Sequence, residues 1–269
     1  MILTYDEFIK KLNEKIKTDA EFYYELLNSV IDEPLRYTGI FRISNAKTKL
    51  IQNATQSREI KFGDFMEDIL TIYISAMGYE NQNKKFGTDE EGNALNADQL
   101  FTKADTVYLI EQKMRDDHDS TKKRGQFDNF RKKCIQLSKK YPGRQLNASM
   151  WFIDKNRAKN KKYYLTRCRA ENIPNCTMSV YYGDTLFNEL FQRNDVWDEI
   201  TSYLQKNKAE RSGDLLTIPD FDTSDEILCA LRRLKNEDIK KFNKLLSDKP
   251  KYVQLRQELF PNGINLSRV

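Results

Sequence analysis

The sequence predicts an α/β protein with a mixed central β-sheet flanked by helices, and with helical additions at both ends of the chain. Two runs near the middle, 98–102 and 106–113, alternate apolar and polar residues and are joined by three residues, which is typical of a β-hairpin. Apolar residues at helix spacing precede and follow this hairpin, and further short apolar runs lie downstream of it. Helices that alternate with strands in this way predict a sheet covered by helices.

The first 60 residues are expected to form an N-terminal region of helix and strand. Apolar residues share a helix face over 8–16 and again over 22–30, with a break near Thr18. Residues 35–53 mix strand-like alternation with basic side chains.

The predicted core spans residues 61–205. It begins with a helix that opens at Gly63 and ends at Gly78, where glycine is a good C-terminal signal, and a polar loop over 83–96 leads into the hairpin. After the hairpin we expect a helix from about Gly125, strands at 149–153, 163–166 and 178–182, and a helix over 185–204.

The last region, 206–269, is expected to be helical and to pack on the core. A composition shift near 206–213 marks its start, and apolar residues recur at helix spacing from Ser224 onward. The three regions could also form one continuous domain.

Composition excludes several classes of protein. Hydrophobic residues make up 39% of the chain and occur throughout it, and glycine is scarce at 10 residues, so the chain is neither disordered nor collagen-like. No apolar run approaches the roughly 18–20 residues that a membrane-spanning helix needs. The N-terminus also lacks the pattern of a cleaved secretory signal. We therefore expect a soluble, cytoplasmic protein without a membrane partner.

Cysteine and histidine usage limits the available chemistry. The four cysteines are scattered without a CxxC pair, and His118 is the single histidine, which disfavours a zinc site and most histidine-based catalytic schemes. We expect reduced thiols at the four positions, which are Cys134, Cys168, Cys176 and Cys229. Catalysis would then depend on carboxylates, lysine and a hard metal ion.

The hairpin carries the most specific signal. Glu111 and Lys113 share one face of its second strand because side chains alternate with a period of two. If the turn is centred between Ala104 and Asp105, Asp98 lies opposite Glu111, with Cβ atoms about 4.5–5.5 Å apart. Two carboxylates this close repel one another unless they share a proton or a cation, and a divalent ion is the natural partner of such oxygens. Asp105 shares the face of Glu111 but lies roughly 20 Å along the strand, too far to share a metal ion.

An Asp, then Glu-x-Lys on the adjacent strand, after a helix that bears Glu67, resembles the motif of the PD-(D/E)XK nuclease superfamily. More narrowly, the chain looks like a type II restriction endonuclease. The resemblance covers roughly residues 63–190, with GDFMED on the first core helix, ADQLF and YLIEQK on the hairpin, RDDHDSTKKRGQ directly after it, and YYGDTLFNEL late in the core. Ala97 replaces the proline of the motif, at a position that varies in the superfamily.

The resemblance implies a PD-(D/E)XK-type core and a role for each motif residue. Asp98 and Glu111 would bind one or two Mg²⁺ ions together with the main-chain carbonyl of Gln112. Lys113 would orient the attacking water or help to deprotonate it, with a pKa lowered by the nearby cation. Glu67 would hold a metal-bound water or a second ion, although a solvated acidic helix face is the ordinary interpretation of its neighbourhood.

Positive charge is concentrated after the catalytic strand. Eleven Lys and Arg residues lie between Lys113 and Arg144, and another basic run covers 155–162, which either contacts DNA or forms a solvated hairpin tip. In RDDHDSTKKRGQ the mixture of donors and acceptors suits base edges, and Gly125 is expected to permit a tight turn into the following helix. The DNA-binding candidates of this segment are Arg115, Asp117, His118, Asp119, Ser120, Thr121, Lys122, Lys123, Arg124 and Gln126.

The function implied by the resemblance is Mg²⁺-dependent, sequence-specific cleavage of double-stranded DNA that leaves 5′-phosphate ends, within a prokaryotic restriction–modification system. A palindromic target would be matched by a homodimer. A cognate DNA methyltransferase would be a genetic partner rather than a physical one. Two alternatives are a structure-selective nuclease for repair or branched DNA, which genomic context would separate, and a DNA-binding protein without cleavage. The second is disfavoured because a pure binder gains nothing from carboxylates that face DNA phosphates.

Overall fold

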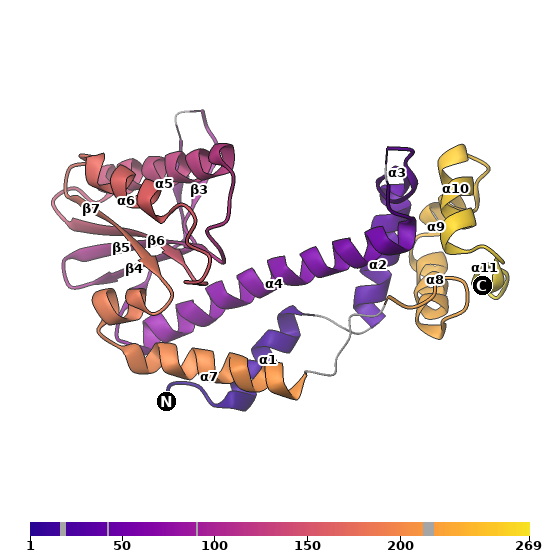
Figure 1. Cartoon of the computed structure of the whole chain (residues 1–269), viewed down its shortest axis with the longest axis horizontal. Helices are drawn as coiled ribbons and strands as arrows, with labels where there is room; N and C mark the ends of the chain where they lie inside the picture. The colour runs from indigo at the N-terminus through magenta and orange to yellow at the C-terminus, as the bar shows by residue number, and fades with distance from the viewer. Residues whose placement is uncertain (17–19, 42, 90, 212–217) are drawn as a thin grey trace. The chain divides into compact units, whose positions relative to one another are not determined.

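The computed structural model describes residues 1–16, 20–41, 43–89, 91–211 and 218–269. Contacts within the chain divide it into two compact units (Figure 1). The first unit comprises residues 1–9 and 63–209, and the second comprises 10–62 and 210–269. In this grouping residues 10–62 share a unit with the C-terminal segment, 210–269. The three-region division expected from the sequence stays a prediction.

The first unit is built around a mixed sheet of five strands in the order β1-β4-β5-β6-β7. β1 and β4 are antiparallel neighbours, β4 and β5 form the antiparallel hairpin, and β5, β6 and β7 are parallel. The strands are β1 (Glu80–Asn81), β4 (Gln99–Lys103), β5 (Thr106–Lys113), β6 (Gln145–Phe152) and β7 (Cys176–Tyr182). The mixed α/β architecture predicted from the sequence is confirmed.

Helices cover both faces of this sheet. On one face α5 (Ser120–Lys140) and α6 (Lys161–Ala170) bury Phe130 and Tyr164 against Leu109 and Met150 of the strands. On the other face, Trp151 packs against the rings of the π-helix η1 (Leu186–Phe191) and of α7 (Asn194–Glu210). The parallel strands β5 and β6 are connected through α5, so α5 begins a short loop after the end of β5.

The second unit is helical. Its apolar core is formed by α2 (Ala20–Asp32), α8 (Asp225–Glu237), α9 (Ile239–Leu246) and α10 (Pro250–Leu259), together with the first turns of α4 (Ala46–Ala76). The remaining helices in the described ranges are α1 (Tyr5–Lys15), α3 (Pro34–Thr38) and α11 (Ile264–Ser267). The helix patterns predicted near both ends are confirmed, whereas the predicted break near Thr18 lies outside the described residues.

The strand-like interpretation of residues 35–53 is wrong, because this stretch contains α3 and the start of α4. The side-chain oxygen of Asn45 accepts a hydrogen bond from the main-chain N–H of Thr48 at 2.9 Å and so caps α4 at its N-terminus. Ala46, Leu50 and Ala54 then bury one helix face in the core of the second unit. Gly63 therefore lies inside α4 instead of opening it.

Three further expectations are corrected. The polar loop over 83–96 contains a separate ribbon, β2 (Lys85–Thr88) and β3 (Ala94–Asn96), because Phe86 and Leu95 are buried on the core beside α5. The strand expected at 163–166 is part of α6. The helix expected over 185–204 is divided between η1 and α7, with Gln192 in the left-handed region at φ 55°.

No helix among the described ranges is long and apolar enough to cross a membrane.

Candidate active site

The hairpin has the register that places the two acids together. Gln99 pairs with Ile110 and Lys103 pairs with Thr106, so the turn lies at Ala104 and Asp105 as predicted. Ala104 adopts φ 49°, which the tight turn requires. Asp98 immediately precedes β4 and lies beside the end of β5, whereas Asp105 is at the opposite end of the hairpin.

The ammonium group of Lys113 donates hydrogen bonds to three oxygen atoms at the end of β5. Its Nζ donates to Asp98 Oδ2 at 3.0 Å, to Glu111 Oε1 at 2.8 Å and to the Gln112 carbonyl at 2.8 Å. The main-chain N–H of Gln112 also donates to Asp98 Oδ2 at 2.7 Å, which holds that carboxylate against the strand. The two carboxylates and the carbonyl are the groups that the superfamily resemblance assigns to the metal ion.

A second lysine, Lys133 of α5, binds the other oxygen of Glu111. Its Nζ lies 2.5 Å from Glu111 Oε2, and both side chains are only 6% exposed. Burial opposes ionisation of Glu111, but Lys113 and Lys133 outweigh it and hold the pKa of this carboxyl below its ordinary value. Sequence reasoning missed Lys133, although its position on the apolar face of α5, with Phe130, Cys134 and Leu137, could have indicated a buried lysine.

The pKa of Lys113 is shifted upward by its carboxylate neighbours, whereas the sequence analysis expected it to be lowered. Burial lowers the pKa of Lys113, but the carboxylates of Glu111 and Asp98 raise it well above its ordinary value. Lys113 is therefore an ammonium ion at neutral pH. The predicted lowering depended on a neighbouring cation and stays a prediction for the metal-bound enzyme.

Glu67 of α4 belongs to the same electrostatic cluster. Its pKa is raised from 4.5 to about 7, mainly by burial and by the negative charge of Asp98, against smaller opposing effects of Lys84 and Lys113, and Asp64 adds the smallest contribution. Glu67 is therefore a carboxyl that exchanges its proton near neutral pH, a property that suits proton transfer.

Gln99 fixes α4 to the hairpin at this point. Its fully buried side chain donates to the Glu67 carbonyl at 2.7 Å and accepts from the Thr71 hydroxyl at 2.8 Å. Sequence reasoning missed this contact, and the only signal was a glutamine at the start of an otherwise apolar strand. Gln99 thus couples the position of Glu67 to that of the neighbouring Asp98.

The segment RDDHDSTKKRGQ forms the loop after β5 and the first turns of α5. Asp119 caps the helix, since its Oδ1 accepts from the main-chain N–H groups of Thr121 and Lys122, both at 2.9 Å. These hydrogen bonds lower the pKa of Asp119. The helix therefore begins at Ser120 and not near Gly125, which lies inside it, and Gln126 is in its second turn instead of at its N-terminus.

Three of the DNA-binding candidates of this segment, His118, Lys123 and Gln126, are partly buried, and the other seven are exposed. Lys123 bonds the Asn160 side chain at 3.2 Å and lies over the Tyr163 ring, and Gln126 accepts from the Tyr164 hydroxyl at 3.0 Å. Burial and Lys122 lower the pKa of the partly buried His118, against the opposing effect of nearby aspartates. The exposed candidates are Arg115, Asp117, Asp119, Ser120, Thr121, Lys122 and Arg124. Whether any of these residues contacts DNA remains a prediction.

Asp116 is a structural anchor of this loop. Its carboxylate is fully buried and accepts from the main-chain N–H of Asn160 at 2.8 Å, from its side-chain amide at 2.9 Å and from the Tyr182 hydroxyl at 2.9 Å. The basic run over 155–162 is therefore not a hairpin tip: it holds Asp116 and leads into α6. This anchoring fixes the path of the loop that follows β5.

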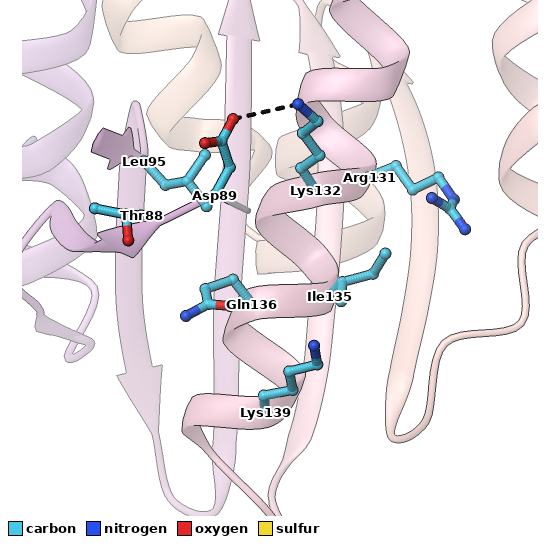
Figure 2. A pocket seen from close by; sticks show the side chains of 8 residues that line it. All are labelled: Thr88, Asp89, Leu95, Arg131, Lys132, Ile135, Gln136 and Lys139. Carbon is cyan, nitrogen blue, oxygen red and sulfur yellow. Dashed lines mark hydrogen bonds and ion pairs between the residues drawn. The ribbon is translucent and has the colours of Figure 1, made fainter. Parts of the chain in front are cut away.

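A hollow of about 330 Å³ lies apart from the carboxylate cluster, between the β2–β3 ribbon and α5 (Figure 2). In Figure 2 Lys132 points toward Asp89, and their charged groups are 3.2 Å apart. Arg131 is also ion-paired, with Glu171 at 2.6 Å. The other lining residues are Thr88, Leu95, Ile135, Gln136 and Lys139. The residues that line the hollow do not include an acid–acid–lysine arrangement like the one at the hairpin.

The donor set at the hairpin fits a hard divalent cation. Within the described ranges no three His, Cys, Asp or Glu side chains form a metal site. The ligands that the resemblance implies are the carboxylates of Asp98 and Glu111 and the Gln112 carbonyl. All three are oxygen donors, the type that Mg²⁺ prefers. The Lys113 ammonium already lies where they converge, which shows that one cation can contact all three.

The comparison with protein families agrees with this geometry. Residues 4–88 and 75–208 match the family model described as type II restriction endonuclease, HinfI, in two overlapping segments that together cover most of the chain. The chain belongs to the HinfI family of type II restriction endonucleases. As a HinfI-family protein it is a site-specific deoxyribonuclease, a hydrolase that acts on DNA, and enzymes of this type generally use a divalent metal ion. No curated protein matches the chain.

Proposed function

We propose that this enzyme hydrolyses double-stranded DNA at a specific sequence with Mg²⁺ as cofactor and leaves 5′-phosphate and 3′-hydroxyl ends. It would act in a prokaryotic cytoplasm as the nuclease of a restriction–modification system. The observation that carries the proposal is the convergence of Asp98, Glu111 and the Gln112 carbonyl on one cationic group at the end of β5.

Asp98, Glu111 and the Gln112 carbonyl would hold the Mg²⁺, which would neutralise phosphate charge and make a bound water more acidic. Hydrolysis that leaves a 5′-phosphate breaks the bond between phosphorus and the 3′ oxygen, so the attacking water must approach in line with that bond. The residues of the site then have to orient this water and receive its proton.

Lys113 and Glu67 divide these two tasks. In the metal-free protein Lys113 is held as an ammonium ion, a form that can orient water and stabilise the negative charge that develops on the phosphate. Burial and Asp98 raise the pKa of Glu67 to about 7 in the metal-free protein, which makes Glu67 the candidate of the cluster for accepting a proton near neutral pH. We therefore assign proton acceptance to Glu67, alongside the role in a water or second-ion site that the resemblance implies.

The contacts with DNA are assigned to the loop after β5 and the first turns of α5. The exposed basic residues there, Arg115, Lys122 and Arg124, are suited to phosphate or guanine contacts. The described residues of one chain form one such site, and a double-strand break requires two, so we propose a two-fold homodimer in which each subunit cuts one strand.

The test is incubation of the purified protein with phage DNA, with and without Mg²⁺, beside Lys113→Ala. Lys103→Ala is the matched control, because Lys103 is the same residue type at the opposite end of the hairpin. Discrete fragments that require Mg²⁺ and Lys113 but not Lys103 would support the proposal, and end-sequencing would identify the site and the 5′-phosphate. Cleavage that persists in Lys113→Ala, or that is restricted to branched DNA, would contradict it.

A further inference from the structure

Lys133 is an unusual residue for the interior of a domain. It lies on the apolar face of α5, packed with Phe130, Cys134 and Leu137, and its side chain is 6% exposed. A buried ion pair is rarely worth more to stability than two well-packed apolar side chains, because both charges lose their hydration. The pair with Glu111 therefore indicates a role other than stabilisation.

The two oxygen atoms of Glu111 have different surroundings. Oε1 is bound by Lys113, whose side chain is 26% exposed and reaches the site beside Asp98. Oε2 is bound by the buried Lys133. An ion that enters from solvent can take the place of the Lys113 ammonium at Oε1, whereas Oε2 is held from inside the core.

We propose that Lys133 is a positioning residue that restricts Glu111 to one metal-binding oxygen and thereby favours Mg²⁺ over Ca²⁺ at the site. The inference rests on the proposed function, since it takes Glu111 as a metal ligand. A carboxylate can bind an ion through one oxygen or through both. Ca²⁺ accepts two-oxygen binding readily, whereas Mg²⁺ demands near-octahedral geometry and usually takes one oxygen from each carboxylate.

Removing the Lys133 ammonium should therefore change the relative affinity for Ca²⁺ and Mg²⁺ more than it changes the fold of the site. In Lys133→Met, Oε2 becomes available, so Glu111 can bind through both oxygen atoms. The loss of one positive charge strengthens the binding of either ion, but only Ca²⁺ also gains the second oxygen. The ratio of Ca²⁺ to Mg²⁺ affinity, and not the affinity for either ion, is the informative quantity.

The experiment measures this ratio without relying on cleavage. Apparent affinities for CaCl₂ and MgCl₂ are obtained from the dependence of the melting temperature on ion concentration in the full-length protein. Fluorescence of Trp151 and Trp197 reports unfolding, since both tryptophans of the chain are in the first unit, as is the site. Lys132→Met is the matched control, because Lys132 is the neighbouring residue and pairs with Asp89 instead.

We expect the ratio of Ca²⁺ to Mg²⁺ affinity to rise at least tenfold in Lys133→Met, to stay near wild type in Lys133→Arg, which keeps the positive charge, and to be unchanged in Lys132→Met. If Lys133→Met does not fold, Lys133→Gln removes the charge and keeps one donor, and the ratio should rise at least threefold. A folded neutral variant that keeps the wild-type ratio overturns the inference.

The experiment distinguishes an error in the role of Lys133 from an error in the proposed function. If the wild-type protein binds neither ion, or if Asp98→Ala binds both ions as tightly as wild type does, the proposed metal site itself is wrong. If the wild-type protein binds Mg²⁺ through Asp98 and cleaves DNA, but the neutral variants keep the ratio, only the role of Lys133 is wrong.

Discussion

Replacement of Glu67 by glutamine should stabilise the protein while it abolishes or severely reduces cleavage. The folded structure raises the pKa of Glu67 from 4.5 to about 7, mainly through burial and the negative charge of Asp98. Folding therefore favours the protonated carboxyl. Below pH 4.5 the group is protonated in both the folded and the unfolded chain and contributes no penalty. As the pH rises from 4.5 to 7 the penalty for ionising Glu67 in the folded state grows, and above 7 it is complete.

The size of the effect follows from the pKa difference. Each pKa unit corresponds to about 1.4 kcal/mol, which gives an upper limit of about 3.5 kcal/mol above pH 7. Glu67 is only partly buried, so screening by solvent reduces the expected value to about 1–2 kcal/mol. For a unit of this size, that corresponds to an increase in the melting temperature of about 2–8 °C.

The assay is thermal unfolding followed by tryptophan fluorescence at pH 5 and pH 8, with EDTA present so that metal binding does not contribute. Glu80→Gln is the matched control, because Glu80 is an exposed residue of β1 in the same unit. Glu67→Gln should melt at a higher temperature than wild type at pH 8 and close to wild type at pH 5, and Glu80→Gln should not show this difference. An equal effect at the two pH values, or a lower melting temperature at pH 8, would refute the reasoning.

Three further predictions concern the site and its approach. Lys113→Ala should lose cleavage yet bind Mg²⁺ about tenfold or more tightly, because the ammonium no longer competes for the same three oxygen atoms; weaker binding, measured by calorimetry, would contradict this. Asp119→Ala should lower the free energy of unfolding by about 1 kcal/mol through loss of the α5 cap, as measured by urea unfolding, whereas Asp117→Ala should have little effect. If Arg124 contacts a phosphate, Arg124→Ala should reduce the slope of log affinity against log salt by about 1 in a DNA-binding titration, and an unchanged slope would exclude that contact.

Local pattern alone was sufficient for the hairpin that carries the site. The period of two placed Glu111 and Lys113 on one face, and the short connection at Ala104 and Asp105 determined which residue lies opposite Glu111. Both are short-range properties, because the register of a hairpin depends on its turn and on its own alternation. The helices near the C-terminus were predictable for the same reason, from apolar spacing within each segment.

Other features depended on the tertiary structure. Patterns with basic or aromatic residues were ambiguous, so the start of α4 at Ala46 and the helical state of Tyr163 and Tyr164 were misread until their buried faces were known. The start of α5 was misjudged because the capping role of Asp119 competed with an interpretation as a base contact.

The chemistry of the site was likewise partly predictable from the sequence and partly decided by the tertiary structure. The sequence by itself determined that two acids and a lysine meet at the end of one hairpin. Only the tertiary structure decided that Lys133 approaches Glu111 from α5, and that burial beside Asp98 raises the pKa of Glu67 to about 7. The physical reason is that a pKa and a buried ion pair depend on groups distant in sequence, which meet only after the helices pack on the sheet.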